Sequence, residues 1–204
     1  MKKIVIVGSS GFAREIEWII NRINSIIPTW NFVGYIDCQN KKDVIGDDSY
    51  LLNYAEELAV VIAIGDPSTR QRLVEMYKKN EKLFFPNIID PSVICSNSVV
   101  LGQGNIICAN TVLTVDIRVG NFNIINLGCT IGHETIIKDY VTLSPSVNVS
   151  GNVILENRIS IGTGCQIIPQ KHIDHDVVLG AGAVVVRDIQ SDCTALGVPA
   201  RIVK

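Results

Sequence analysis

A histidine followed directly by a glutamate, His133–Glu134, is the residue pair in this chain best suited to acid–base chemistry. An unperturbed imidazole has a pKa of about 6.5, so it can remove a proton from a substrate at neutral pH. A carboxylate hydrogen-bonded to the other ring nitrogen would fix the tautomer and stabilise the imidazolium that forms. We therefore predict that His133 is a general base and that Glu134 orients it.

The sequence around this pair repeats every six residues. An aliphatic residue stands at every sixth position from Leu101 to Val185, and Cys95 and Ile89 extend the series backwards. A second column of mostly small or β-branched residues lies two positions earlier in each repeat. A period of six fits neither a strand nor a helix and is typical of a β-solenoid. Three hexapeptides would close one triangular coil of 18 residues, with the aliphatic column inside.

The repeat gives His133 a predicted position. It stands two residues after the inward-facing Ile131, at a corner of the coil, where the imidazole would face a groove rather than the core. Gly151 follows 18 residues later, one coil further along the same corner. A glycine permits close approach of a substrate, and its backbone N–H could stabilise an oxyanion. The alternative is that Gly151 is an ordinary turn residue.

Before the repeats, strand and helix signals alternate. Residues 2–8 and 31–37 are typical of strands, and residues 12–23 have apolar side chains at helical spacing. Residues 54–66 are predicted to form a short helix leading into a buried strand, and residues 67–80 another amphipathic helix. This alternation predicts a small parallel sheet with right-handed crossover connections.

A glycine-containing loop joins the first predicted strand to the first predicted helix, in VGSSGFAREI. Helix N-termini bind anions through free N–H groups and the helix dipole. The motif is G-x-x-G and lacks the full dinucleotide-binding fingerprint, so a purely structural turn is the alternative. Asp37 ends the second strand, and Gly65 and Asp66 end the third. Ligands of open α/β sheets bind at such carboxyl ends, so these residues could share one site.

Composition argues against several classes of protein. The net charge is −2 without a basic run, which argues against nucleic-acid binding. No apolar stretch approaches the roughly 18 residues of a membrane span, and the apolar N-terminal run is too short for a signal peptide, so we expect a cytoplasmic protein. Charged residues are only 19%, which suggests that another copy covers part of the surface.

The cysteines have no C-x-x-C spacing, and we expect them to pack as small apolar residues rather than to form disulfides. They are Cys38, Cys95, Cys108, Cys129, Cys165 and Cys193.

Several motifs resemble a known group of enzymes. The hexapeptide columns, GAGAVVVRD at 180–188 and GVPARIV at 197–203 resemble the left-handed β-helix acyltransferases of the hexapeptide-repeat superfamily. Together with IVIVGSSGFAREI, GYID and AIGDPSTR, they resemble bacterial sugar acetyltransferases. That group includes nucleotide-amino-sugar N-acetyltransferases and sialic acid O-acetyltransferase-like proteins.

The resemblance implies an α/β plus β-solenoid fold. Residues 1–85 would be a Rossmann-like βαβ domain that binds a nucleotide-linked sugar, and residues 86–204 a left-handed parallel β-helix that transfers the acyl group. It also implies acetyl-CoA as co-substrate, no metal, and a homotrimer with the acyl-CoA groove between neighbouring solenoids.

The resemblance further implies roles for individual residues. In the sugar N-acetyltransferases, a histidine followed by an acidic residue is the proposed base and its partner, as at His133–Glu134. The loop would hold the acceptor's diphosphate, and Asp37 would contact the uracil or ribose. The acceptor-binding residues would be Ser10, Gly11, Phe12, Asp37, Gly65 and Asp66. The acetyl-CoA groove would include Asn126, Thr142, Gly151, Thr163 and Ala181. Phe12 and Thr142 stand where some relatives have histidine, so the acceptor or its binding can differ.

We therefore expect an acetyl-CoA-dependent N-acetyltransferase for a nucleotide-linked amino sugar, such as a 4-amino-deoxy sugar, in surface polysaccharide or glycan biosynthesis. O-acetylation of a sugar such as sialic acid is an alternative, because one base serves amines and hydroxyls alike. A non-catalytic scaffold is a second alternative, but the His–Glu pair and glycine loop argue against it.

A zinc carbonic anhydrase on the same solenoid is a third alternative and would need three converging imidazoles. His133 and His175 are 42 residues apart, which is seven repeats, so they fall on different faces. His172 occupies another repeat position, and the three cannot meet.

Overall fold

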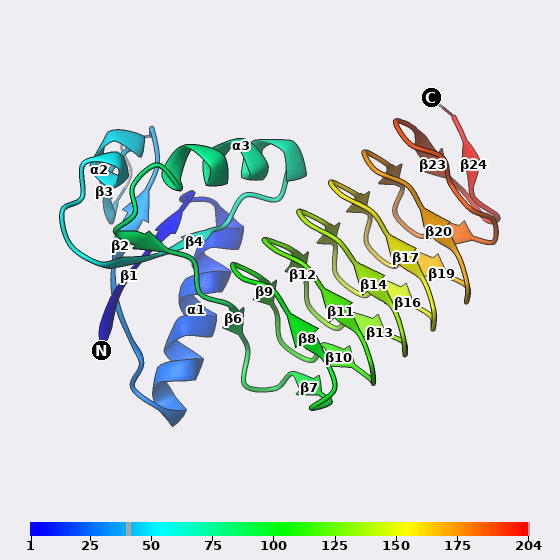
Figure 1. Cartoon of the computed structure of the whole chain (residues 1–204), viewed down its shortest axis with the longest axis horizontal. Coiled ribbons are helices and arrows are strands. Elements are labelled where there is room, and N and C mark those ends of the chain that lie inside the picture. Colours follow the sequence, from blue (N-terminus) through cyan, green and yellow to red (C-terminus); the bar gives the residue numbers. More distant parts are fainter. Residues whose placement is uncertain (40–41, 204) are drawn as a thin grey trace.

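The computed structural model describes residues 1–39 and 42–203, and two architectures follow one another along the chain (Figure 1). A parallel sheet with helices comes first. A stack of short strands in triangular coils then extends away from it to the C-terminal end. The α/β plus β-solenoid fold predicted from the sequence is therefore confirmed.

The N-terminal sheet has five parallel strands in the order β3-β2-β1-β4-β5. The strands are β1 (Lys2–Val7), β2 (Trp30–Ile36), β3 (Val44–Gly46), β4 (Leu58–Ile62) and β5 (Leu83–Phe84). The helices are α1 (Gly11–Ile26), α2 (Asp48–Leu52) and α3 (Pro67–Tyr77).

Alternate residues of β1 separate the two faces of this sheet. Ile4 and Ile6 pack with buried side chains of α1, whereas Val5 and Val7 pack with α3. Because successive side chains of a strand point to opposite faces, α1 and α3 cover opposite sides of the sheet. The loops that follow β1 and β4 therefore meet at one edge of the sheet, between the two helices.

The helix expected within residues 54–66 is wrong in position, although its strand is present as β4. The helix lies earlier, as α2, and begins at Asp47, whose side chain accepts a hydrogen bond from the Ser49 N–H. Residues 53–57 are turn and irregular backbone. The start of this helix is set by the capping carboxylate of Asp47, in a D-D-S sequence. The prediction relied on the spacing of apolar residues, which does not include this capping signal. The short strands β3 and β5 were also not predicted.

The solenoid consists of short parallel strands, and from β6 to β19 each pairs with the strand 18 residues later. Three sheets result, with the orders β22-β19-β16-β13-β10-β7, β20-β17-β14-β11-β8 and β24-β23-β21-β18-β15-β12-β9-β6. A final antiparallel pair, β23 with β24, ends the last of these sheets.

The strands of the first of these sheets are β7 (Ile94–Cys95), β10 (Val112–Leu113), β13 (Thr130–Ile131), β16 (Asn148–Val149), β19 (Gln166–Ile167) and β22 (Val184–Val185). Those of the second are β8 (Val100–Leu101), β11 (Arg118–Val119), β14 (Ile136–Ile137), β17 (Ile154–Leu155) and β20 (His172–Ile173). Those of the third are β6 (Ile88–Ile89), β9 (Ile106–Ile107), β12 (Ile124–Ile125), β15 (Thr142–Leu143), β18 (Ser160–Ile161), β21 (Val178–Leu179), β23 (Thr194–Leu196) and β24 (Arg201–Ile202).

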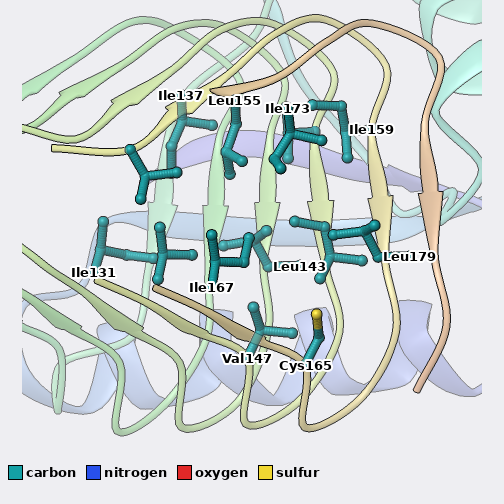
Figure 2. Packing of buried hydrophobic residues seen from close by; sticks show 14 of the residues in the cluster. Ile131, Ile137, Leu143, Val147, Leu155, Ile159, Cys165, Ile167, Ile173 and Leu179 are labelled. Carbon is teal, nitrogen blue, oxygen red and sulfur yellow. The ribbon is translucent and has the colours of Figure 1, made fainter. Parts of the chain in front are cut away.

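Both six-residue columns lie in the interior. Members of the aliphatic column, such as Ile131 and Leu143, and of the second column, such as Val147 and Cys165, point into the same prism (Figure 2). The aliphatic column is buried from Ile107 onward, whereas Cys95 is exposed. The first coil has no earlier coil to cover it, and this explains the difference.

The solenoid also packs directly against the N-terminal part. Ile88, Ile106 and Ile124 belong to the same buried cluster as the apolar side of α1. Phe122 belongs to the cluster that contains α3. The sheet with its helices is thus fixed to the first coils by apolar burial on both sides. Among the residues that the structure describes, no helix has the length and apolar character needed to cross a membrane.

Candidate active site

His133 lies where the sequence predicted it, in the turn that follows β13. Its side chain is 62% exposed, and Nδ1 lies 3.1 Å from Oε2 of Glu134. With Nδ1 directed at the carboxylate, Nε2 is the ring nitrogen left to accept a proton. Glu134 has a positive φ of 59°, which turns the chain at this corner and places the two side chains together.

Gly151 lies directly beside the imidazole, one coil further on. A Cβ built on Gly151 would lie 2.5 Å from Cε1 and 2.8 Å from Cδ2 of the His133 ring. Only a residue without a side chain leaves the ring in this position. The backbone also joins the two coils here, since the Asn152 N–H donates to the His133 carbonyl at 2.7 Å.

Two corners of the solenoid carry the predicted groove residues. We call the corner with His133 and Gly151, between the sheets of β13 and β14, the His133 edge. The corner with Thr163 and Ala181, between the sheets of β18 and β19, is the Thr163 edge, and Asn126 lies on it three coils earlier than Gly180. The sheet that contains β13 separates the two edges within one chain.

A cavity of about 350 Å³ lies between the glycine loop and the Thr163 edge. Ser10, Phe12 and Gly65 line it from the N-terminal part, and Asn126 and Thr142 from the solenoid. The structure thus brings together residues from both predicted groups, acceptor-binding and acetyl-CoA-binding. Its volume lies in the range of small-molecule sites.

Thr142 takes part in the contact between the two parts of the chain. Its hydroxyl donates to the Gly65 carbonyl at 2.7 Å and accepts from Nη2 of Arg70 at 3.0 Å. This hydroxyl therefore already has two partners, neither of which is near His133. Its expected role in the acetyl-CoA groove stays a prediction.

Arg70 is a residue that the sequence reasoning missed. It is 1% exposed and donates to the carbonyls of Phe122 at 2.8 Å, Ile64 at 2.7 Å and Gly65 at 3.0 Å. Burial without a carboxylate in hydrogen-bond contact lowers its pKa to about 10. A signal did exist, because Arg70 occupies the buried stripe of α3 with Pro67 and Leu73.

The predicted acidic residues at the strand ends have local partners. The Asp37 carboxylate accepts from Ser9 Oγ at 2.6 Å and from the Gln39 N–H at 3.0 Å. Burial raises the pKa of Asp37, but these hydrogen bonds outweigh it and the net pKa is lowered. The Asp66 carboxylate caps α3 by accepting from the Thr69 N–H at 2.8 Å.

The loop residues themselves are open. Ser10 is the N-cap of α1 without a side-chain hydrogen bond to the helix, and Gly11 is the first helical residue. The nearest atom to a Cβ at Gly11 would be Nη2 of Arg14, at 3.9 Å. Asp37 lines a neighbouring cavity with Gly8, on the other side of the loop.

His133 does not line the cavity between the loop and the solenoid. Within one chain the predicted base and the predicted acceptor loop are therefore on different edges of the solenoid. The structure places Gly151 beside His133, and it places Asn126 and Thr142 beside the loop. Within one chain, the pair of His133 and Gly151 does not lie beside the loop.

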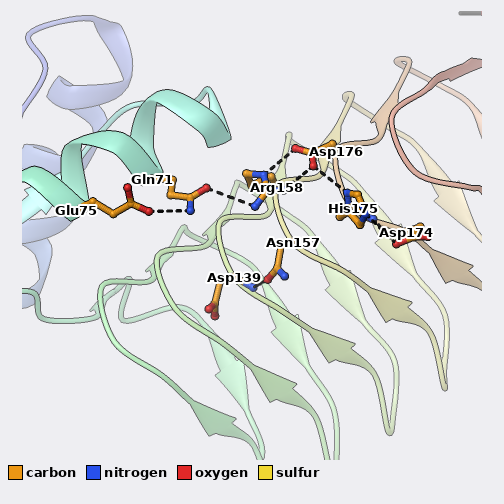
Figure 3. A network of polar contacts seen from close by, with 8 residues as sticks. All are labelled: Gln71, Glu75, Asp139, Asn157, Arg158, Asp174, His175 and Asp176. Atoms are coloured by element: carbon orange, nitrogen blue, oxygen red, sulfur yellow. Dashed lines mark hydrogen bonds and ion pairs between the residues drawn. The ribbon is translucent and has the colours of Figure 1, made fainter.

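A second polar cluster lies on the third corner of the solenoid (Figure 3). Arg158 donates to both oxygens of Asp176, at 2.7 and 2.5 Å, and Asp176 also contacts Nδ1 of His175 at 2.9 Å. In the part of the chain described, His175, Asp176 and Asp192 are the one group whose atoms could hold a metal ion. Because Arg158 already pairs with Asp176, we assign no metal site here. Gln71 links the cluster to α3.

Comparison with known proteins agrees with this architecture. The family described as the PglD N-terminal domain matches residues 3–77. A crystal structure of a perosamine N-acetyltransferase variant from Caulobacter crescentus, in complex with CoA and GDP-perosamine, is 28% identical. The comparison covers 100% of this chain and 98% of that one, with a TM-score of 0.92.

Two curated relatives match by sequence. GDP-perosamine N-acetyltransferase from Escherichia coli O157:H7 is 29% identical over 126 residues, 59% of this chain and 54% of that protein. Serine acetyltransferase from Synechococcus elongatus is 33% identical over 85 residues, 38% of this chain and 35% of that protein. The chain thus spans between about a third and a half of the length of these curated relatives. The resemblance to the sugar acetyltransferases of the left-handed β-helix superfamily is confirmed.

Proposed function

We propose that this protein is an acetyl-CoA-dependent N-acetyltransferase that acts on a nucleotide-linked amino sugar, with His133 as general base. The observation that carries the proposal is the exposed imidazole of His133, which contacts Glu134 through Nδ1 and lies against Gly151. The relatives that bind CoA and GDP-perosamine support the choice of donor and acceptor class. This reaction belongs to glycan biosynthesis, and we place it in the cytoplasm, as the sequence led us to expect.

The reaction needs one proton acceptor. The amine nitrogen of the sugar attacks the thioester carbon of acetyl-CoA, a C–N bond forms, and Nε2 of His133 takes the proton from nitrogen. The backbone N–H of Gly151 is the donor that we propose for the oxyanion. The C–S bond then breaks, and the imidazolium returns its proton to the leaving thiolate. Glu134 stabilises the imidazolium between these steps.

We propose that the site forms between copies of the chain, in a homotrimer. The His133 edge of one copy would face the Thr163 edge and the loop cavity of the next, because the two edges lie apart within one chain. Exposed apolar side chains on both edges support this arrangement. They are Val115 and Ile168 near His133, and Leu127 near Thr163. Residues 1–85 would bind the acceptor and residues 86–204 would hold acetyl-CoA.

Mixed trimers test both parts of this proposal. His133→Ala and Gly11→Leu should each abolish most of the activity with acetyl-CoA and a panel of GDP- and UDP-linked 4-amino sugars, measured by thiol release. Dissociating and reassembling the two variants together should restore activity, because some interfaces then pair an intact His133 with an intact loop. Activity that stays at the level of the separate variants would show that one chain provides the whole site. A monomer with full activity would also refute the proposal that the site forms between copies of the chain.

Kinetics of the separate variant test the base. General base catalysis contributes about 10²–10⁴-fold, so kcat of His133→Ala should fall by that factor while both KM values change little. The side chain is exposed, so the melting temperature should not change. Near-normal turnover would exclude His133 as the base.

A further inference from the structure

The cavity between the glycine loop and the solenoid has a single charged residue in its lining, Glu15. The polar remainder consists of hydroxyls and an amide, including Ser10, Asn126 and Ser144. An apolar wall that includes Phe12 and Leu127 completes the cavity. The surface that a ligand would meet therefore has one negative charge and no positive charge of its own.

The Glu15 carboxylate is available to a ligand. It lies on α1, in the turn after Gly11, and is exposed. No hydrogen bond or ion pair of Glu15 is found within residues 1–39 and 42–203. It faces the solenoid, since it lines the same cavity as Ile124, Asn126 and Ser144. Helix α1 thus fixes the position of Glu15, but the carboxylate makes no hydrogen bond or ion pair that would stabilise the fold among the residues that the structure describes.

In the described part of the chain, no guanidinium group forms a hydrogen bond or ion pair with this carboxylate. The Arg14 guanidinium lies beside Gly11 and does not line the cavity, and its positive charge acts on Tyr35. Arg70 lies behind the cavity wall, 1% exposed, and donates to the Gly65 carbonyl and the Thr142 hydroxyl. A ligand in the cavity would meet those two acceptor groups and not the guanidinium itself.

We propose that Glu15 selects a cationic acceptor by pairing with the ammonium group of the amino sugar. This inference rests on the proposed function and extends it, because His133 and Glu134 serve an amine and a hydroxyl equally well. An ammonium–carboxylate pair in a partly enclosed cavity stabilises the bound acceptor, whereas a neutral hydroxyl gains less from it. A sugar that carries its own carboxylate, such as sialic acid, would be repelled by Glu15.

Glu15 and Glu134 are therefore expected to have different roles in the reaction. Glu15 acts on capture of the acceptor, and its loss should appear in the KM for the amino sugar. Glu134 acts through the imidazole, and its loss should appear in kcat. The ammonium group must release one proton to solvent before the neutral amine attacks, and the second proton then passes from nitrogen to the partner copy's imidazole and on to the leaving thiolate.

Steady-state kinetics of Glu15→Gln test the inference, with GDP-perosamine and a panel of other GDP- and UDP-linked 4-amino sugars as acceptors. We expect the KM for the amino sugar to rise about ten- to a hundredfold, as for loss of a charge-assisted hydrogen bond, with kcat within about threefold. The KM for acetyl-CoA should not change. Glu15→Asp should recover part of the affinity.

Glu17→Gln is the matched control, because Glu17 lies on the same helix but is hydrogen-bonded to Tyr35, away from the cavity. An equal rise in KM for both variants, or none for Glu15→Gln, would overturn the role of Glu15 while the proposed acetyl transfer stands. A wild-type enzyme that acetylates sialic acid but none of the amino sugars would overturn both.

Discussion

The ring of His133 lies against the Cα of Gly151, so closely that a methyl group at residue 151 would overlap the imidazole. The two residues belong to successive coils of the His133 edge, and parallel pairing of β13 with β16 fixes their alignment. The position of the exposed side chain that we propose as the base is thus set by the absence of a side chain on its neighbour.

Gly151→Ala should therefore disturb catalysis more than folding. The atoms nearest to the new Cβ all belong to the exposed imidazole, which can rotate away, so we expect kcat to fall at least tenfold with little change in melting temperature. Gly132→Ala is the contrasting variant, because its Cβ would lie 2.5 Å from the backbone nitrogen of Gly151, which cannot rotate away. That variant should melt several degrees lower. Unchanged kcat in Gly151→Ala would mean that the position of the ring does not matter.

Gly11→Leu should weaken acceptor binding and leave acetyl-CoA binding nearly unchanged. A side chain at residue 11 has room, since the nearest atom to its Cβ is 3.9 Å away, so the fold should survive. It would nevertheless cover the open N–H groups at the start of α1, where an anion would bind. Calorimetric titrations with a nucleotide sugar and with CoA measure the two affinities separately. Equal losses for both ligands would contradict a phosphate role for this loop.

The periodic parts of this fold could be predicted from sequence, but the contacts between them could not. A six-residue column such as Ile107 to Val185 determines strand length, coil size and the corner on which His133 lies, because every repeat obeys the same geometry. The start of α2 depended instead on one capping carboxylate, Asp47. The hydrogen-bond partners of the Thr142 hydroxyl are Gly65 and Arg70. They are more than 70 residues away in the sequence, and no local sequence pattern connects them with Thr142.

The hydrogen bond between Arg70 and Thr142 joins the N-terminal part to the solenoid, and we predict that the two residues are energetically coupled in folding. Arg70→Met leaves the carbonyls of Phe122 and Ile64 without their side-chain donor, and each unsatisfied buried acceptor costs about 1–3 kcal/mol. Thr142→Val should cost about 1 kcal/mol, as for a single net hydrogen bond. The double variant should cost less than the two losses combined, because each residue is the other's partner. Denaturant unfolding of the four proteins measures this coupling, and strict additivity would contradict it.

The ion pair between the buried Asp90 and the partly exposed Arg22 predicts a dependence of stability on pH. Asp90 is 1% exposed and accepts from Arg22 at 2.7 and 3.1 Å and from the hydroxyl and N–H of Ser92. Burial raises the pKa of Asp90, but Arg22 and Ser92 outweigh it, and the net pKa lies below its ordinary value. Folding is therefore favoured above the ordinary aspartate pKa of about 3.9, and this stabilisation is lost as pH falls through the lower folded value.

Asp90→Asn should accordingly be less stable than the wild type at pH 7, by about 1–3 kcal/mol for hydrogen bonds that involve a charge. Below about pH 4 the difference should shrink, because the carboxyl is then protonated in the unfolded wild type, and it should disappear as the pH falls through the lower pKa of the folded state. Asp116→Asn, which removes an exposed carboxylate of the solenoid, is the control and should show no such trend. Urea unfolding of the three proteins between pH 3 and pH 7 gives the comparison. A stability difference for Asp90→Asn that is constant over this range would mean that the charge of Asp90 does not hold α1 to the first coil.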